Sequence, residues 1–222
     1  FAQLGINDLV LKLNNRKVLE GLAEKHGILE SFRDMTVALD KLDKIGINGV
    51  AKELEQRSIS GDILKSIEAF LESGYGAEER LNYLKEELSQ SEKGMAGIRE
   101  IEKVLEYGNS KEFKSLDITI DLTLARGLDY YTGIIYEVIP EHSALGSIAS
   151  GGRYDDLTSQ FGLKDVSGVG ISFGLDRIYD LMEEREIFKE EQKDGVKVMI
   201  ANFGQDEFQS RLFSLVQELR SF

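Results

Sequence analysis

The stretch LDITIDLTLARGLDYYTGIIYEV, residues 116–138, carries the clearest fold signal in the chain. Residues 116–125 alternate between apolar side chains and aspartate or threonine, which is typical of a strand with one buried face. GIIYEVI, at 133–139, predicts another strand directly afterwards. The stretch therefore indicates two consecutive strands of one sheet.

Two further strands are predicted after residue 146, and both are rich in small residues. They are SIASGGRYDDL at 147–157 and VSGVGISF at 166–173. Parallel neighbours need crossovers of about a dozen residues, so four closely spaced strands predict an antiparallel sheet. GLDRIYDLMEERE, at 174–186, then has the apolar spacing of an amphipathic helix.

The residues before this sheet are mostly helical in pattern. LVLKLNN at 9–15 predicts a strand, and NRKVLEGLAEKHG at 15–27 predicts a helix that ends at Gly27. Apolar residues recur at helical spacing from 37 to 109, which predicts a small helical insertion. After a charged linker, residues 196–222 predict one more strand and helix.

Together these elements predict an α+β fold, with an antiparallel sheet flanked by helices. We expect the sheet core to comprise residues 1–36 and 113–190, and the helical insertion to comprise residues 37–112. Residues 195–222 are expected to begin a separate α/β domain.

Composition excludes several classes of protein. The formal net charge of −13 argues against a general nucleic-acid binder, because phosphates are held mainly by lysine and arginine. The chain has no cysteine and two histidines, which excludes disulfides and predicts no structural zinc. Since no apolar run approaches the ~20 residues of a membrane span, we expect a cytoplasmic protein with no membrane partner. The start at Phe1 predicts a piece of a longer protein.

Arg177 falls in the first turn of the last predicted core helix, where the helix dipole makes a cation slightly unfavourable. With the free N–H groups of that helix, it would form a phosphate site. The alternative is a surface pair with Asp176 or Asp180. A ligand site is favoured by three glycines nearby, because a strand without side chains admits a ligand to its backbone: Gly168, Gly170 and Gly174. Their spacing does not match G-x-G-x-x-G, so a dinucleotide fold is not indicated.

Arg126 is a second candidate cation, at the end of the strand predicted at 116–125. The polar face of that strand could line a cleft that hydrogen-bonds a polar ligand. Tyr130 and Tyr131 follow, and if the strand continued through them only one ring would face the cleft. The alternative is a surface arginine, with one tyrosine in the core and the other at its rim.

A glycine pair opens a third motif, GGRYDDL at 151–157. Such a pair within a strand pattern marks a bulge or a close approach of another group. Arg153 has a structural interpretation, in which Asp155 or Asp156 holds it.

Three motifs, in this order and at these spacings, resemble the histidyl-tRNA synthetase family of class II aminoacyl-tRNA synthetases: RGLDYYTG at 126–133, GGRYD at 151–155 and GVGISFGLDR at 168–177. The resemblance covers essentially the whole chain. The helical stretch is similar to the family's insertion domain, and residues from 196 onward are similar to the start of its anticodon-binding domain. Two earlier motifs of the family are not among these residues, which implies an incomplete catalytic unit.

The resemblance implies an enzyme that activates histidine with ATP, which brings Mg²⁺ as part of the substrate, and transfers it to tRNA(His). It implies no protein-bound metal. Arg126 would contact the α-phosphate and the histidine carboxylate, stabilising charge that grows on the phosphoryl oxygens. Arg177, with Gly174, would hold the ATP tail. The histidine pocket would comprise Arg126, Tyr130, Tyr131, Gly151, Gly152 and Tyr154.

The resemblance also implies a homodimer for the whole enzyme, while the piece itself could self-associate through an exposed sheet edge. Candidate tRNA contacts are cations of the helical insertion, such as Lys93, Arg99 and Lys103, although a solvated helix face is the simpler interpretation. Two alternatives to an enzyme are a silent relative, such as the regulatory subunit of ATP phosphoribosyltransferase or a tRNA-sensing domain, and an unrelated α+β protein. The retained motif arginines and tyrosines favour the enzyme.

Overall fold

The computed structural model of the chain describes residues 1–74, 76–108, 117–125, 130–188, 198–200 and 209–219. The chain divides into two compact units, Phe1–Ile187 and Phe188–Phe222, and each is described by itself. The sheet and the candidate site lie in the first unit.

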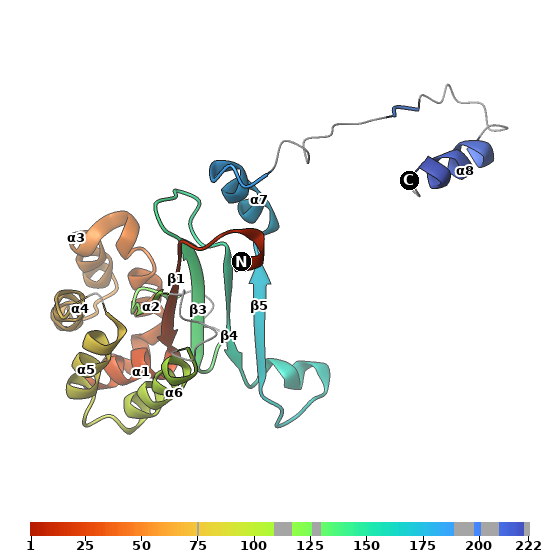
Figure 1. The fold of residues 1–222 in the computed structure, drawn as a ribbon. Coiled ribbons are helices and arrows are strands. Elements are labelled where there is room, and N and C mark those ends of the chain that lie inside the picture. Colours follow the sequence, from red (N-terminus) through yellow and green to blue (C-terminus); the bar gives the residue numbers. More distant parts are fainter. Residues whose placement is uncertain (75, 109–116, 126–129, 189–197, 201–208, 220–222) are drawn as a thin grey trace. The chain divides into compact units, whose positions relative to one another are not determined.

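The first unit contains a five-stranded sheet with the strand order β2-β1-β3-β4-β5 (Figure 1). The pairs β1/β3, β3/β4 and β4/β5 are antiparallel, whereas β1 and β2 are parallel. A mixed sheet flanked by helices confirms the predicted α+β class. The strands are β1 (Leu9–Asn15), β2 (Asp117–Ile120), β3 (Ile134–Pro140), β4 (Ala149–Tyr154) and β5 (Gly168–Phe173).

The strand predicted over 116–125 is shorter than expected and has a different neighbour. β2 ends at Ile120, because the Asp121 carboxylate accepts hydrogen bonds from the Thr123 N–H (2.9 Å) and hydroxyl (2.6 Å) and turns the chain. β2 pairs with β1 and not with β3. The helices between β1 and β2 supply the long crossover that a parallel pair needs, so the antiparallel expectation is not met at this edge.

Helix α1 (Arg16–Lys25) follows β1 without a linker. The Asn15 side chain caps it by accepting a hydrogen bond of 2.9 Å from a backbone N–H of the first turn. Gly27, just beyond the helix, has a φ of 66°, in the left-handed region that glycine adopts at little cost. β1 and α1 confirm the first predicted strand and helix.

Helices α2–α6 follow α1 and share one hydrophobic core with it and with part of the sheet. They are α2 (Phe32–Leu39), α3 (Leu42–Gln56), α4 (Asp62–Glu72), α5 (Ala77–Glu87) and α6 (Glu92–Gly108). Fully buried side chains of this core include Met35, Leu54, Ile63, Phe70 and Leu84. The helical stretch is confirmed, and its boundaries as a separate domain stay a prediction, since the core continues from α1 through α6.

Helices α1 and α6 cross at close range. A Cβ atom at Gly21 would lie 2.7 Å from the Cα of Gly94, and one at Gly97 would lie 2.9 Å from the backbone N of Val18. Neither backbone has room for a methyl group at those distances. The crossing therefore depends on glycine at these positions.

Helix α7 (Leu175–Glu184) confirms the helix predicted after the last strand. Its Ile178 and Leu181 side chains are buried on one face of the sheet, in a cluster with Leu9 and Val138. This second cluster is separate from the core of α1–α6. The sheet is thus covered on the α7 side near β1, β3 and β4.

Strand β5 forms one edge of the sheet and exposes apolar side chains. Val169 is 71% exposed, Ile171 51% and Phe173 56%. They alternate with Gly168, Gly170 and Ser172, whose side-chain positions lie on the other face.

The second unit contains α8 (Gln209–Leu219), which confirms the predicted final helix. The strand predicted at 196–203 lies mostly outside the described residues. Within the part of the chain that the structure describes, no helix is both long and apolar enough to cross a membrane.

Candidate active site

Strand register sorts the side chains of the sheet into rows, because neighbouring residues on paired strands point to the same face. One face carries a polar row that crosses four strands: Lys12, Glu137, Ser150 and Ser172. The row beside it on the same face ends in glycines on β4 and β5: Asn14, Ile135, Gly152 and Gly170. This face is therefore polar and, toward β5, nearly free of side chains.

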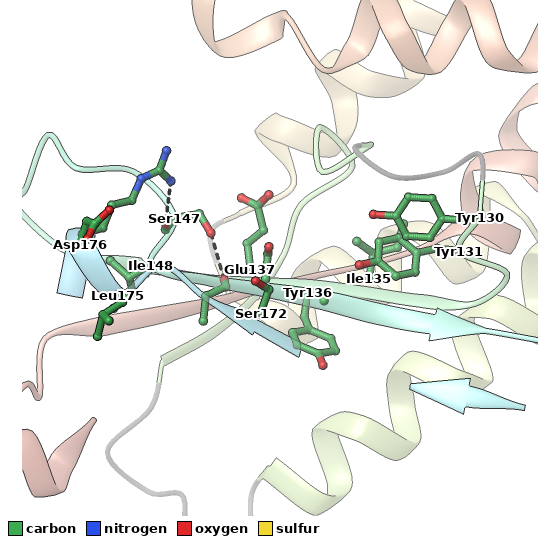
Figure 2. Close-up of a pocket in the computed structure, with 15 residues that line it drawn as sticks. Tyr130, Tyr131, Ile135, Tyr136, Glu137, Ser147, Ile148, Ser172, Leu175 and Asp176 are labelled. Carbon is green, nitrogen blue, oxygen red and sulfur yellow. Dashed lines mark hydrogen bonds between the residues drawn. The ribbon is translucent and has the colours of Figure 1, made fainter. Parts of the chain in front are cut away.

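A cavity of about 370 Å³ lies over the polar row. Figure 2 shows Glu137 on the same side of the sheet as Tyr130 and Tyr131, with Tyr136 on the other side. The cavity brings together residues that the three sequence motifs contribute separately: Tyr130, Tyr131, Gly151, Gly174 and Arg177. Its size and its mixture of apolar walls and polar groups are typical of a small-molecule site.

Both tyrosines of the first motif line this cavity. β3 begins at Ile134, so Tyr130 and Tyr131 precede the strand and do not alternate between its faces. Their ring centroids lie 4.4 Å apart at an interplanar angle of 55°. Burial raises the pKa of Tyr131, and the hydrogen bond with Tyr130 raises it further. Tyrosine is neutral at neutral pH in any case, and the raised pKa keeps the Tyr131 phenol protonated at higher pH as well.

The two glycines of the second motif point to opposite faces. A Cβ atom at Gly152 would lie 2.7 Å from a Tyr131 ring carbon, so this glycine makes room for the tyrosine. A Cβ atom at Gly151 would instead strike the carbonyl of Gly170 and the Tyr136 hydroxyl. Tyr130 and Tyr131 together form a tyrosine wall at this end of the cavity. Only Gly152 faces that wall with the position where a side chain would begin, while Gly151 contributes backbone to the cavity.

The ring of Tyr154 accounts for the presence of glycine at two positions of β5. A Cβ atom at Gly168 would strike the Tyr154 ring, and one at Gly170 would lie 3.3 Å from it. The sequence suggested that these glycines admit a ligand to the strand. In the structure the space above them is taken by the ring of Tyr154, on the same face as Gly152.

Arg177 is the third residue of α7, as predicted, and its Nη1 donates a hydrogen bond of 2.6 Å to the Ser147 carbonyl. Within the described residues it forms no ion pair with Asp176 or Asp180. Ser147 and Asp176 lie at the opposite end of the cavity from Tyr130 and Tyr131 (Figure 2).

A second cavity, of about 350 Å³, adjoins the first. The two share Glu137, Ser147 and Arg177 in their linings. The guanidinium of Arg177 therefore stands between two hollows on the polar side of the sheet. An exposed cation in that place can meet an anionic ligand from either hollow.

A family model described as histidyl-tRNA synthetase matches residues 1–178. The chain belongs to the histidyl-tRNA synthetase family. The histidine–tRNA ligase of Christiangramia forsetii is 47% identical over 208 residues, which are 93% of this chain and 46% of that protein. That of Porphyromonas gingivalis is 43% identical over 220 residues, which are 99% of this chain and 48% of that protein. The chain spans about half the length of these curated relatives.

Solved structures of the family share the fold. A histidyl-tRNA synthetase from a Nostoc species has a TM-score of 0.77 and 34% identity, and the match covers 100% of this chain and 52% of that one. A Bacillus halodurans structure described as an ATP phosphoribosyltransferase regulatory subunit/histidyl-tRNA synthetase has a TM-score of 0.63 at 20% identity, covering 99% of this chain and 54% of that one. At that identity it shows the fold alone, so the likeness to a regulatory subunit is the more distant one.

Arg126, the family's predicted catalytic arginine, lies outside the described residues together with 127–129. The structure does describe both flanks of this segment. On one side, the Asn14 side-chain amide donates to the Leu124 carbonyl at 2.9 Å. On the other, the Thr132 N–H donates to a carbonyl of β4 at 2.9 Å. The role of Arg126 stays a prediction.

The floor of the family's candidate site contains residues that sequence reasoning missed. Glu137 lies on this floor, and Lys12, its neighbour in the polar row, lines the adjoining cavity. Each is a charged residue among apolar neighbours, in LVLKL at 9–13 and in IIYEVI at 134–139, and that contrast is the signal that would have found them. Ser150 and Ser172 carry no such signal, and only the register brings them into line. Lys12 also pairs with Asp121 at 2.7 Å.

The predicted tRNA candidates are all exposed on α6: Lys93, Arg99 and Lys103. Lys93 pairs with Glu20 of α1 at 2.7 Å. Nothing in this arrangement departs from a solvated helix face, which was the simpler interpretation.

Proposed function

We propose that the chain is part of a histidine–tRNA ligase, which activates histidine with ATP and Mg²⁺ to histidyl-adenylate and transfers it to tRNA(His). The observation that carries the proposal is the single cavity with a tyrosine wall at one end and an exposed arginine at the other, over a polar floor. Membership of the family supports the same reaction.

The tyrosine end suits the imidazole of histidine. A neutral phenol can exchange a hydrogen bond with a ring nitrogen, and an apolar ring of similar size would leave that phenol unpaired. Tyr131 supplies such a phenol, and its raised pKa only extends the neutral form to higher pH. Gly152 gives the tyrosine its place without adding a side chain that would narrow the pocket.

The arginine end suits the phosphates of ATP. The first turn of α7 offers unpaired N–H groups and the positive end of the helix dipole. Arg177 adds a planar guanidinium that can bind two phosphate oxygens at once. Gly174, directly before the helix, lines the same cavity.

The chemistry between the two ends is assigned to Arg126. In the first step a carboxylate oxygen of histidine attacks the α-phosphorus, and pyrophosphate leaves. Charge grows on the phosphoryl oxygens, and a fixed guanidinium stabilises it more than it stabilises the ground state. In the second step a hydroxyl of the tRNA 3′ end attacks the carbonyl carbon and AMP leaves.

The proposal extends to the whole protein. It includes a homodimer, a site of action in the cytoplasm, no protein-bound metal, and an anticodon-binding domain that begins near residue 195. We expect residues 1–222 alone to bind ligands better than they catalyse, because they span about half the length of the relatives.

Ligand-induced thermal stabilisation tests the proposal. A ligand that binds only the folded state raises the unfolding midpoint, and we expect a histidyl-adenylate analogue to raise it more than histidine or ATP does. Tyr131→Phe should reduce the shift with histidine, and Arg177→Ala the shift with ATP. Tyr107→Phe and Arg99→Ala, at exposed positions on α6, are the matched controls.

Two outcomes would count against it. If none of the three ligands raised the unfolding midpoint, the proposed ligand site would be wrong. A histidine shift without any ATP effect would indicate a histidine sensor in place of a ligase.

A further inference from the structure

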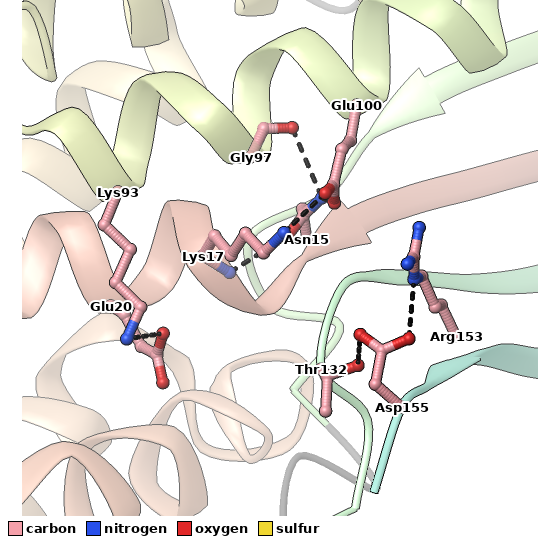
Figure 3. Close-up of polar contacts among 9 residues, drawn as sticks. All are labelled: Asn15, Lys17, Glu20, Lys93, Gly97, Glu100, Thr132, Arg153 and Asp155. Atoms are coloured by element: carbon pink, nitrogen blue, oxygen red, sulfur yellow. Dashed lines mark hydrogen bonds and ion pairs between the residues drawn. The ribbon is translucent and has the colours of Figure 1, made fainter. Parts of the chain in front are cut away.

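Arg153 of β4 and Asp155, which directly follows that strand, hold Thr132 of the loop that carries Tyr130 and Tyr131. The Thr132 hydroxyl donates to Asp155 Oδ2 at 2.8 Å, and its N–H donates to the Arg153 carbonyl at 2.9 Å. Arg153 Nε donates to the other carboxylate oxygen of Asp155 at 3.0 Å. Figure 3 shows the Asp155 carboxylate between Thr132 and Arg153.

We propose that Asp155 is a positioning residue that fixes the Tyr131 ring against Gly152 through its hydrogen bond to Thr132. Its consequence for histidine binding rests on the function proposed above. Asp155 does not line the cavity, so it acts through Thr132 and not on the ligand itself.

The loop is short, so this anchor controls the ring directly. Thr132 follows Tyr131 in the chain, and Gly133 is tied in turn, because its carbonyl accepts from the Arg16 N–H at 3.0 Å. The ring fits closely against the backbone of Gly152, where even a Cβ atom would lie 2.7 Å from it. If the loop moved by a fraction of an ångström, the Tyr131 hydroxyl would move away from the imidazole of bound histidine.

A carboxylate is well suited to this task. Burial favours the protonated form of Asp155, but the hydrogen bonds from Thr132 and Arg153 outweigh it and lower the pKa of this carboxyl. The group therefore stays ionised at neutral pH. It accepts one hydrogen bond on each oxygen, and bonds to a charged acceptor are shorter and stronger than neutral ones.

If Asp155 served only to stabilise the fold, its loss would lower the free energy of unfolding without acting specifically on the Tyr131 ring. The side chains of Arg153 and Asp155 are 46% and 39% exposed, and ion pairs this exposed add little to stability. Loss of Asp155 should therefore affect global stability weakly and the tyrosine wall strongly.

A double-mutant cycle separates the two roles. Thr132→Val removes the hydroxyl at nearly constant shape, and Asp155→Ala removes its acceptor. The first readout is the proton NMR shift of the Gly152 Hα, which we expect the ring current of Tyr131 to displace in the wild-type protein because the ring lies against this glycine. The second is the dissociation constant for histidine, measured on the same samples by calorimetry.

We expect each single variant to move the Gly152 shift toward its random-coil value and to weaken histidine binding about tenfold, as losing a bond to a charged group does. The double variant should be no worse than either single one, because both remove the same bond. Thr132→Ser keeps the hydroxyl, so the Gly152 shift and the histidine dissociation constant should both stay near their wild-type values. Ser143→Ala removes a hydroxyl-to-carboxylate bond of 2.9 Å to Glu184 elsewhere, and should change neither.

Additive effects, or an unchanged Gly152 shift in the single variants, would overturn the positioning role. If the wild-type protein binds no histidine, the proposed function fails instead. The Gly152 shift still decides the positioning role in that case, because it needs no ligand.

Discussion

Asp121 lies just beyond β2 and is one of the few buried carboxylates of the described chain. Its Oδ2 pairs with Lys12 Nζ at 2.7 Å, while its Oδ1 accepts from the Thr123 N–H and hydroxyl. Burial alone would raise the pKa of Asp121, but Lys12 and Thr123 together outweigh it and lower the pKa. The pair ties Lys12, at the β1 end of the polar row, to the segment that leads to Arg126, and both residues line the adjoining cavity.

A lowered carboxyl pKa makes stability depend on pH in a defined direction. The stabilisation is present above the ordinary carboxyl pKa, and it is lost as the pH falls below about 4 through the pKa of the folded state. We expect Asp121→Asn to lower the free energy of unfolding at pH 6 by about 1–3 kcal/mol and to flatten its fall toward pH 3. Urea unfolding at several pH values measures both.

The control for this experiment is Asp180→Asn, which removes an exposed carboxylate on α7. It should leave the profile almost unchanged. An Asp121→Asn profile parallel to that of the wild type would contradict the prediction.

The tyrosine pair shows how far single residues could be predicted. The motif singled out Tyr130 and Tyr131, but alternation along a continued strand would have turned one ring away. The structure starts β3 later, at Ile134, and leaves both rings on one side (Figure 2). The deciding contact is with Gly152, some twenty residues away, which local periodicity cannot register.

The crossing of α1 and α6 is a close helix contact that depends on Gly21, Gly94 and Gly97. We expect Gly21→Ala to lower the free energy of unfolding by about 1–3 kcal/mol, because the added methyl group forces the helices apart. Urea unfolding of the variant measures the change.

Gly61→Ala is the matched control, since a Cβ atom at Gly61 meets nothing within 4 Å and its φ of −72° suits alanine. Its unfolding free energy should stay within about 0.5 kcal/mol of the wild type. Equal effects of the two variants would show that the crossing can relax.

Elements were predicted best where the pattern is local. LVLKLNN gave the bounds of β1, and the apolar spacing at 174–186 gave α7. The prediction failed at 116–125, where alternation continues in the sequence but Asp121 turns the chain. It failed again for the neighbour of β2, because alternation states which face is buried and not which strand lies alongside.

At the scale of the whole molecule, β5 is an edge strand whose outer side chains are apolar and exposed. Such edges pair with other chains unless a charge or a covering segment blocks them. We expect residues 1–222 to self-associate as their concentration rises, and Val169→Lys to shift association to higher concentration. Sedimentation velocity over a concentration series measures the degree of self-association of both proteins.

Val37→Lys provides the control, because it makes the same change of charge at a 43% exposed valine on α2. If both variants shift association equally, net charge and not the β5 edge is responsible.

The candidate site was predictable in its parts but not in its assembly. The motifs pointed to Arg177, the tyrosines and the glycines, and one cavity now joins them. The floor beneath them is made by β3, β4 and β5 in register. The same polar row continues to Lys12, which lines the adjoining cavity and comes from a strand more than 100 residues away from the others in sequence. Register between distant strands is a property of the fold, which no single stretch of sequence encodes.

Tyrosine rings gather around the cavity, so the intrinsic tyrosine spectrum of the protein should respond to ligand binding. The chain has eight tyrosines and no tryptophan. The rings of Tyr130 and Tyr131 line one end of the cavity, and Tyr154 lies on the neighbouring glycines of β5. Three of the eight tyrosine rings are therefore within or beside the site, and no tryptophan masks their signal, so occupancy can be followed from the tyrosine absorbance and emission of the unlabelled protein.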